Sequence, residues 1–349
     1  MHLFDLDLNQ WQEWLKKNNQ PAFRSKQIMQ WIYNKNELDV SKMHNIGNAT
    51  FELLQQFNNS NLSVISDYAS DDGTTKWLMK LATGQHLETV YIPEKERGTL
   101  CISSQVGCAL ACSFCATGLM GLNRNLKTHE IISQVWLARK LIAPRKITNI
   151  VFMGMGEPLM NEPALYPALN ILLSDYGFGL SKHRVTVSTS GIVPAMVRLQ
   201  QNSPCSLALS LHAPNDELRN QLVPINKKYP ISELIKVCKS HTSGPEKRHI
   251  MLEYLMLKDV NDLDIHAKQL INIASQFRCK INLIPYNSVP GIEYSASSDE
   301  RVYQFQKRLK AAGIVTTVRK QRGDPIAAAC GQLAGIKSDK TSKSLRDES

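Results

Sequence analysis

The chain has 349 residues, with 41 Lys and Arg against 31 Asp and Glu, and so carries a net charge of +10. Apolar residues make up 43% of it, enough for a full core, and charged residues make up 21%, too few for a wholly disordered chain. No apolar run approaches the roughly 18 residues of a membrane-spanning helix, and the acidic, polar start is not typical of a signal peptide. We therefore expect a cytoplasmic globular protein, with one large domain or one domain plus a smaller one, and no membrane partner.

The first 65 residues predict a small helical N-terminal domain. Asn9 is expected to cap a first helix, with Gln12 returning the bond, and Pro21 is expected to end it. Two further short helices follow. Residues 66–97 then predict a hairpin or linker, because two alternating stretches flank a turn.

Residues 98–300 repeat a strand and then a helix. The strands are expected at residues 99–104, 147–153, 184–190, 206–212, 249–257 and 280–286. Six such units predict a parallel sheet buried on both faces, open or curled towards a partial barrel. Residues 301–336 form a C-terminal extension that opens with a seventh strand. In sheets of this kind, reactive residues belong at the C-terminal ends of the strands.

The positive charge is concentrated at the C-terminal end. Residues 1–85 hold eight basic and nine acidic side chains, a net of −1, whereas residues 301–349 hold eleven and four, a net of +7. A polyphosphate backbone gains affinity from each cation it meets, so this distribution favours a nucleic-acid partner. A solvated basic surface with a disordered tail over residues 337–349 explains the charge equally well.

Four of the eight cysteines, Cys101, Cys108, Cys112 and Cys115, fall within fifteen residues. In a reducing compartment, clustered cysteines more often bind metal or do chemistry than form disulfides. A structural zinc site would need a fourth ligand, which Cys101 could supply, but zinc knuckles usually contain a second CxxC or a His pair, and this sequence has neither. Three thiolates suit instead a four-iron cluster with one iron left open, where S-adenosylmethionine can bind.

These motifs resemble those of a known family. CxxxCxxC with Phe114 before the last cysteine is the signature of the radical S-adenosylmethionine superfamily. The stretches LCISSQVGCALACSFCATG, NRNL, FMGMGEPL and AACGQL are similar to the RlmN/Cfr group of adenosine methyltransferases, and to its RlmN branch in particular. The resemblance runs through Leu333. It implies an α/β fold, a partial (β/α)6 barrel of the radical S-adenosylmethionine type with a helical N-terminal domain and a C-terminal extension.

The resemblance also implies a cofactor site. Cys108, Cys112 and Cys115 would hold a [4Fe-4S] cluster, and Gly156 and Glu157 would bind S-adenosylmethionine. Gly154 and Gly156 would let the backbone approach that ligand. Other polar residues at strand ends are more often hydrogen-bonding caps than ligands, but the family's cofactor-binding positions match Ser188, Ser210, Leu211, His212 and Asn287.

Three further residues receive reactive roles from the resemblance. Cys330 would be methylated and then deliver the methyl carbon, Cys101 would form a disulfide with it to release the product, and Glu88 would act as the general base. The neighbouring basic residues favour the thiolate of Cys330. Pro325 and Ala327 depart from the polar residues expected there and leave the conformation of the Cys330 segment open.

The implied activity is methylation of carbon 2 of adenosine in 23S rRNA and in tRNA, at the adenosine 3′ of the anticodon. It would pass through an S-methylcysteine and use two molecules of S-adenosylmethionine per turnover and an unidentified electron donor. We expect a monomer. Two alternatives stay open: methylation at carbon 8, as in the Cfr branch, which shares these motifs, and a zinc-stabilised RNA-binding protein without catalysis.

Overall fold

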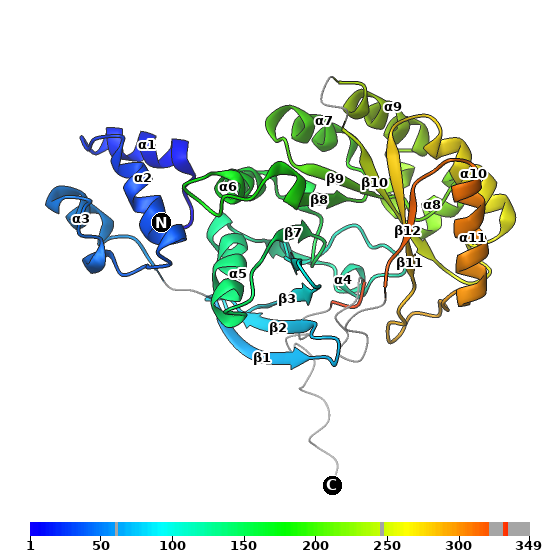
Figure 1. Ribbon diagram of the computed structural model, residues 1–349, viewed down its shortest axis with the longest axis horizontal. Coiled ribbons are helices and arrows are strands. Elements are labelled where there is room, and N and C mark those ends of the chain that lie inside the picture. Colours follow the sequence, from blue (N-terminus) through cyan, green and yellow to red (C-terminus); the bar gives the residue numbers. More distant parts are fainter. Residues whose placement is uncertain (60–61, 245–247, 321–330, 334–349) are drawn as a thin grey trace, which may run out of the picture.

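One mixed sheet organises the computed structural model, which describes residues 1–59, 62–244, 248–320 and 331–333 (Figure 1). Its strand order is β1-β2-β3-β4-β7-β8-β9-β10-β11-β12. The bounds are β1 Ser63–Ala69, β2 Thr75–Lys80, β3 His86–Pro93, β4 Gly98–Cys101, β7 Asn149–Phe152, β8 Val185–Thr189, β9 Ser206–Ser210, β10 Ile250–Met256, β11 Cys279–Pro285 and β12 Thr316–Val318. Neighbours from β1 to β4 are antiparallel and those from β4 to β12 are parallel. The order ends at β1 and β12, so the parallel strands form an open, partial barrel.

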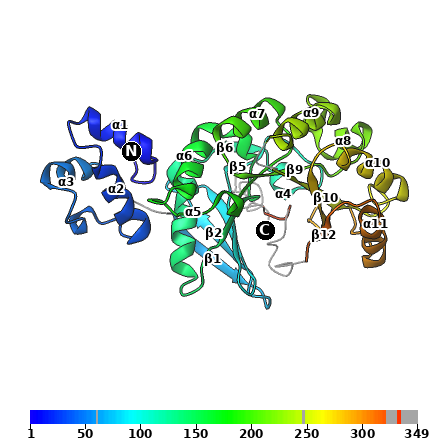
Figure 2. The ribbon, with the colours of Figure 1, turned by 45° about the horizontal axis from the view of Figure 1, so that its top comes forward.

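Helices cover the outside of the sheet. Figure 2 shows them as an arc around the strands. Their bounds are α5 Thr128–Leu141, α6 Glu162–Leu173, α7 Val193–Asn202, α8 Asp216–Leu222, α9 Ile231–Thr242, α10 Asp264–Ala274 and α11 Asp299–Ala311. The short helix α4 Ala116–Leu119 lies inside this arc instead (Figure 2). None of the described helices is long and apolar enough to cross a membrane.

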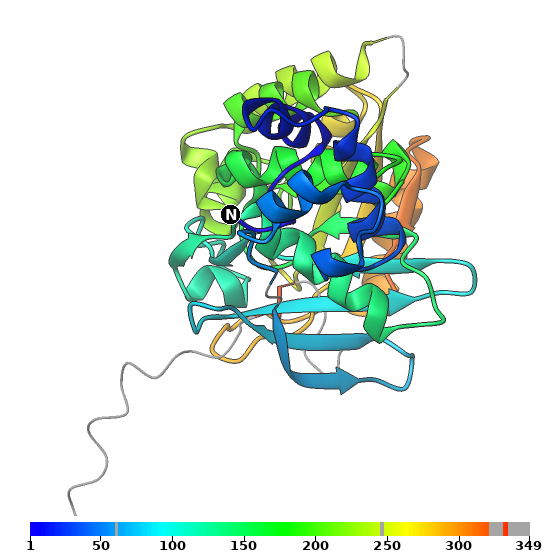
Figure 3. The ribbon, with the colours of Figure 1, turned by 90° about the vertical axis from the view of Figure 1, so that its left-hand side faces the viewer.

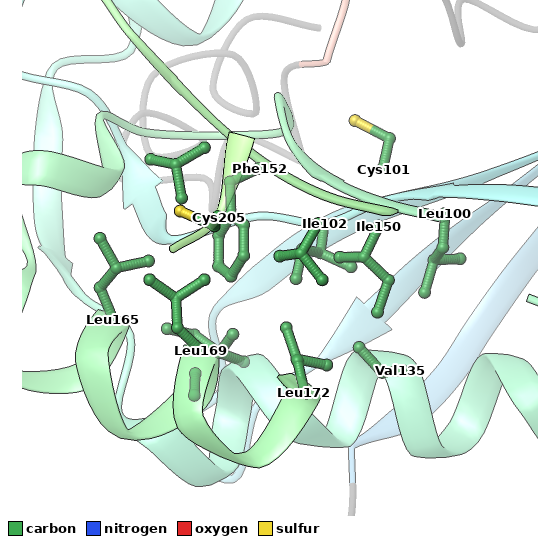
Figure 4. Close-up of a cluster of buried hydrophobic side chains, with 14 of the residues drawn as sticks. Leu100, Cys101, Ile102, Val135, Ile150, Phe152, Leu165, Leu169, Leu172 and Cys205 are labelled. Atoms are coloured by element: carbon green, nitrogen blue, oxygen red, sulfur yellow. The ribbon is translucent and has the colours of Figure 1, made fainter. Parts of the chain in front are cut away.

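The register of the sheet separates an outer face from an inner face. Residues paired across strands share a face, and successive residues alternate between faces. Ile150 pairs with Val185 and Leu209 with Leu252, and all four are buried. In Figure 4 the outer side chains point towards Val135 of α5 and Leu165, Leu169 and Leu172 of α6, whereas the Cys101 sulfur points the other way. The outer face is thus the hydrophobic core.

The inner face is polar. Pairing runs from Cys101 to Val151 and on to Thr186 and Ser206 across β4, β7, β8 and β9. A second row crosses the sheet nearer the strand ends, where Ser210 pairs with Glu253, Glu253 with Asn282 and Asn282 with Thr317. Polar groups buried on a sheet face require partners or a ligand. The inner face is therefore the place to look for a site.

The N-terminal helices form a separate unit that rests on α5 and α6. They are α1 Leu8–Lys17, α2 Arg24–Met29, continued by a π-turn at Gln30–Asn34, and α3 Asn48–Leu54. Trp136 Nε1 donates to the carbonyl of Ile32 at 3.2 Å, and Asn170 Nδ2 donates to Asp7 Oδ2 at 2.8 Å. In Figure 3, which looks onto these helices, β1–β3 run below them.

Most predicted elements are found, with three omissions and one wrong cap. All six core strands, the seventh strand and both hairpin strands are present, but β1 and the small antiparallel pair β5 Gln105–Gly107 and β6 Leu122–Asn125 were not predicted. The prediction of Asn9 as the first N-cap is wrong. Asp7 caps the helix, with its Oδ1 accepting from Gln10 N at 2.9 Å and Gln10 Oε1 accepting from Asp7 N at 3.0 Å. Both pairs have the same spacing, and the earlier one places a carboxylate at the positive end of the helix.

Candidate active site

A cavity of roughly 990 Å³, part of it continuous with solvent, lies at the C-terminal ends of the parallel strands. Its walls come from residues that follow β7, from the ends of β8, β9, β10 and β11, from the loop between β5 and α4, and from residues 331–333. This is the edge of the sheet at which ligands bind in parallel α/β folds.

The three cysteines of the CxxxCxxC motif line this cavity together. Their loop is shaped by backbone hydrogen bonds, among them Cys115 N to the Cys112 carbonyl at 3.1 Å and Cys108 N to the Gly121 carbonyl at 2.9 Å. Ala111 adopts a φ of 49° within it. A tight turn of this kind brings residues of one short segment round a single centre.

Burial makes two of these thiols hard to ionise without a cation. Desolvation, together with repulsion from neighbouring groups, raises the pKa of Cys108 to about 11 and that of Cys112 to about 12. A metal centre reverses this preference, because a bound cation stabilises thiolates and releases their protons. The Cys108 and Cys112 thiols are therefore matched to a cationic group rather than to a role as free nucleophilic thiolates.

The three motif cysteines are the residues of this cavity that would hold a cluster. Among the described residues, no three His, Cys, Asp or Glu side chains are placed as ligands of one metal ion. In a four-iron cluster each thiolate binds a different iron, so the sulfurs stand apart around it.

Glu157 is a buried carboxylate at the cavity wall. Its Oε2 accepts from Ser190 N at 2.8 Å and its Oε1 from Leu159 N at 3.1 Å. Burial outweighs these bonds and raises the pKa of Glu157 to about 7. A cationic ligand group in the cavity would favour the ionised form, so this position suits an ammonium.

The two glycines before Glu157 allow close packing within the protein and not only the approach of a ligand. A Cβ at Gly156, whose φ is 96°, would lie 2.4 Å from Gln105 Cβ, and one at Gly154 would lie 2.7 Å from the Ile102 carbonyl. The expectation that these glycines let the backbone approach a ligand is therefore incomplete. They let the turn after β7 approach the segment that leads to the cysteine loop, so that Glu157 and the cysteines share one cavity.

Hydroxyl and imidazole groups complete the cavity wall. Ser188 Oγ and Ser210 Oγ lie 3.4 Å apart at the ends of β8 and β9. His212 has a φ of 57° and stacks edge-on against Phe114, with ring centroids 4.8 Å apart. Burial, then the charge of Arg219, lowers the pKa of His212 to about 3, so its imidazole is neutral. Its Nδ1 accepts from Leu255 N at 3.2 Å.

Not every predicted cofactor residue lines this cavity. Cys108, Cys112, Cys115, Gly156, Glu157, Ser188, Ser210 and His212 do. Leu211 is buried in the core instead, and Asn287 is buried without being part of the described cavity wall. Cys330 lies outside the described residues, but its neighbour Gly331 lines the cavity and its carbonyl accepts from Ala116 N at 2.8 Å.

Glu88 and Cys101 lie on the inner face but away from the cavity wall. Cys101 pairs with Val90, two residues from Glu88 on β3, so these side chains share a face. A strand carboxylate is usually exposed to solvent, but Glu88 is buried and forms an ion pair with Lys76 of β2.

Two buried charged residues of the site were missed from the sequence. Arg219 of α8 is fully buried and donates to the carbonyls of Leu211, Ser190 and Ser210, which ties together the ends of β8 and β9. Glu253 lines the cavity and accepts from Asn282 Nδ2 at 2.9 Å. The only local signal for Glu253 is a carboxylate inside an otherwise apolar strand.

Comparisons with known proteins agree with this site. Residues 102–267 match the family model of the radical SAM superfamily, and residues 1–58 match that of the ribosomal RNA large subunit methyltransferase N-terminal domain. The chain is similar to a radical SAM methyltransferase of known crystal structure from Sphaerobacter thermophilus, with 41% identity, a TM-score of 0.89 and coverage of 96% of this chain and 100% of that one.

Curated relatives cover nearly the whole chain. It is 50% identical to the dual-specificity RNA methyltransferase RlmN of Vesicomyosocius okutanii and 51% identical to that of Ruthia magnifica, in each case over 92% of this chain and 91% of the relative. Identity to the protein of the same name from Marinobacter nauticus is 48%, over 93% and 90%. Identity of this extent, the two family matches and the shared fold lead to one conclusion. The chain belongs to the RlmN family, within the radical S-adenosylmethionine superfamily.

Proposed function

We propose that this protein is a radical S-adenosylmethionine RNA methyltransferase that methylates carbon 2 of adenosine in 23S rRNA and in tRNA, at the adenosine 3′ of the anticodon. One observation carries the proposal: three motif cysteines and the carboxylate of Glu157 line one cavity, in a chain about half identical to dual-specificity RNA methyltransferases. The +7 charge of residues 301–349 is compatible with an RNA substrate. We further propose that it works in the cytoplasm, as a monomer served by an external electron donor.

The cofactors are a [4Fe-4S] cluster and S-adenosylmethionine, two molecules per turnover. Cys108, Cys112 and Cys115 would hold the cluster, and Glu157 would bind the methionine ammonium. Ser188, Ser210 and His212 offer polar groups to the rest of the molecule, and we keep Leu211 and Asn287 as further contacts. When bound, the cluster and S-adenosylmethionine would supply a methyl group and a carbon radical. That chemistry belongs to the cofactors rather than to the chain.

The reactive groups of the chain then act in order. Cys330 accepts a methyl group and later presents its carbon to the base. Glu88 would remove the proton from carbon 2 of the ring, as the radical adduct returns its unpaired electron to the external electron carrier. Cys101 would then attack the sulfur of Cys330: the sulfur–sulfur bond forms, the sulfur–carbon bond breaks, and the released carbon takes up a proton to become the methyl group of the product. The shared inner face of Glu88 and Cys101, together with Gly331 at the cavity wall, supports this assignment.

The target chemistry explains why a radical is needed. Carbon 2 of adenine lies between two ring nitrogens and is electron-poor, so it does not attack a sulfonium methyl as a nucleophile. A carbon radical can add to it. The cavity lies inside a partial barrel, so the base must be unstacked, in a loop or flipped out of a helix, to reach it.

The test is anaerobic reconstitution followed by nucleoside analysis. The reconstituted enzyme, incubated with S-adenosylmethionine, a reductant and either an rRNA fragment or tRNA, should give 2-methyladenosine at one position in each RNA. The Cys112→Ala variant is the control and should bind little iron and give none. Methylation at carbon 8 would move the function to the Cfr branch, and a colourless, zinc-containing protein that binds RNA without modifying it would overturn the proposal.

A further inference from the structure

A buried ion pair lies on the inner face, on the side of the sheet that precedes the parallel strands. Lys76 Nζ lies 2.9 Å from Glu88 Oε1, and the two side chains are 9% and 8% exposed. Lys76 pairs with Val90 and Leu78 pairs with Glu88 in the antiparallel β2–β3 ladder. Lys76 and Glu88 are therefore diagonal neighbours on one face, close enough for a long side chain to bridge.

Stability alone is a weak explanation for this pair. Among the ion pairs of the described residues it is the only one with both side chains less than 10% exposed. Removing two charges from water is costly, and replacing a buried pair with apolar residues is often neutral or stabilising. A pair retained inside the sheet calls for another role.

The position of the pair suggests that role. Lys76 pairs with Val90, and Val90 with Cys101, so the three stand in one row across β2, β3 and β4. Glu88 lies two residues from Val90 on the same face. An ammonium, a carboxylate and a thiol thus share a face, and two of them are the groups to which we assign proton removal and product release.

We propose that Lys76 is a positioning residue for Glu88. Its ammonium holds the buried carboxylate in one orientation until Glu88 takes the proton from carbon 2 of the adenosine. The proton passes to a Glu88 oxygen, the electron pair of the carbon–hydrogen bond stays in the base, and Lys76 keeps its own proton throughout. This inference rests on the proposed function, because it assumes that Glu88 is the base.

The physical reason is the fixed place of the Glu88 carboxylate. Its Oε1 lies 2.9 Å from the Lys76 ammonium, and this contact fixes the direction in which the carboxylate points. A general base must lie within hydrogen-bond reach of the proton that it removes. Loss of Lys76 should therefore slow the reaction after the methylene carbon has joined the RNA.

The test follows that covalent intermediate in single turnovers of the reconstituted holoenzyme with RNA. Lys76→Met should slow product release at least tenfold and accumulate a protein–RNA adduct on a denaturing gel, as Glu88→Gln should. Lys76→Arg, which keeps the charge, should recover release to within a few fold of the wild type. Lys80→Met, an exposed lysine of the same strand, is the matched control and should release normally. Methylation of Cys330, measured by peptide mass, should be unchanged in all of them.

Two comparisons make the outcome decisive. The double variant Lys76→Met/Glu88→Gln should stall no more deeply than Glu88→Gln alone, because Lys76 acts through Glu88; a deeper stall overturns the inference. If Lys76→Met does not fold, Lys76→Gln is measured in its place, with the same expected stall. Normal release by Glu88→Gln refutes the base itself, whereas a stall of Glu88→Gln with normal release by the Lys76 variant refutes only the role of Lys76.

Discussion

The two faces of the ten-stranded sheet differ in the kind of side chain that is stable on each. On the outer face, Ile150, Val187 and Leu209 are buried against helices, and any apolar side chain of similar volume would serve. On the inner face, burial of Ser188, Ser210 and Glu253 is unfavourable unless each side chain forms a hydrogen bond to a ligand or to another polar group. The difference teaches that stability and chemistry are carried by alternate residues of the same strands, so each can be changed with limited effect on the other.

Two buried cysteines make this comparison directly. Figure 4 shows Cys205 among the apolar side chains and the Cys101 sulfur pointing away from them. Both are nearly inaccessible, with Cys101 6% and Cys205 3% exposed, so burial does not distinguish them. The two cysteines are distinguished by the face of the sheet on which each lies.

The largest expected effect is loss of turnover in Cys101→Ala. Without the thiol that attacks Cys330, the variant should methylate Cys330 and join it to RNA, then accumulate the adduct as a slow band on a denaturing gel. Cys205→Ala, its control, should turn over normally and lose about 1 kcal/mol of stability. Normal turnover by Cys101→Ala, with no adduct, would make Cys101 a structural residue and remove the disulfide step.

The next effect separates the faces by stability. Ile150→Ala leaves a cavity in the core and should lower the free energy of unfolding by about 2–5 kcal/mol. Val151→Ala, the next residue and on the inner face, is only half-buried and should cost about 1 kcal/mol. Urea midpoints measure both. Equal losses would mean that the inner face contributes to the core as much as the outer one does.

The third prediction concerns a contact that joins a helix on the outer face to the segment after β4. Gln134 of α5 is fully buried and reaches the end of β4, where its Nε2 donates to the Ser103 carbonyl at 2.9 Å and its Oε1 accepts from Ser103 N at 2.8 Å. Gln134→Leu leaves both backbone groups buried without partners and should cost about 2–4 kcal/mol.

The control for this change is Gln276→Leu, at an exposed glutamine just beyond α10, which should change stability by less than about 0.5 kcal/mol. Because Ser103 lies between Cys101 and the cysteine loop, Gln134→Leu should also lower the iron bound after reconstitution. A variant that is destabilised yet retains full iron would show that the loop is held independently of α5.

The outer face is the part of the molecule that its sequence predicts best. Each core strand is a short apolar run between helical stretches, and the bounds of every such strand lie within a few residues of the predicted ones. The strands that were missed lack that signal: β1 is mostly exposed, and β6 is a polar four-residue strand paired only with β5. Their existence depends on pairing rather than on burial of an apolar face.

The candidate site divides in the same way. Motif residues such as Cys112 and Glu157 are recognised from short motifs that resemble those of the family, and they do meet at one cavity. Lys76, Arg219 and Glu253 belong to no sequence motif, and their importance arises from partners elsewhere in the chain. Apart from the apolar strand around Glu253, no local pattern signals that these charges are buried, so their roles needed the structure.

The smallest expected effect lies where the N-terminal helices meet α5. The Asp5 carboxylate accepts from His2 N at 2.7 Å and lies 2.7 Å from His129 Nδ1. Burial alone would raise the pKa of Asp5, but the hydrogen bonds from His129 and His2 hold it below its usual value. A carboxylate with a lowered pKa stabilises the fold at pH values above its unfolded pKa of about 4, and this stabilisation is lost as the pH falls below that value.

Asp5→Asn should therefore lower the free energy of unfolding by about 1 kcal/mol at pH 7, and the difference in this free energy from the wild type should narrow below pH 4. Urea midpoints at pH 7 and pH 3.5 measure this, with the exposed Asp67→Asn as the control that should shift neither. A gap that stays constant with pH would show that the contact depends on the shape of Asp5 rather than on its charge.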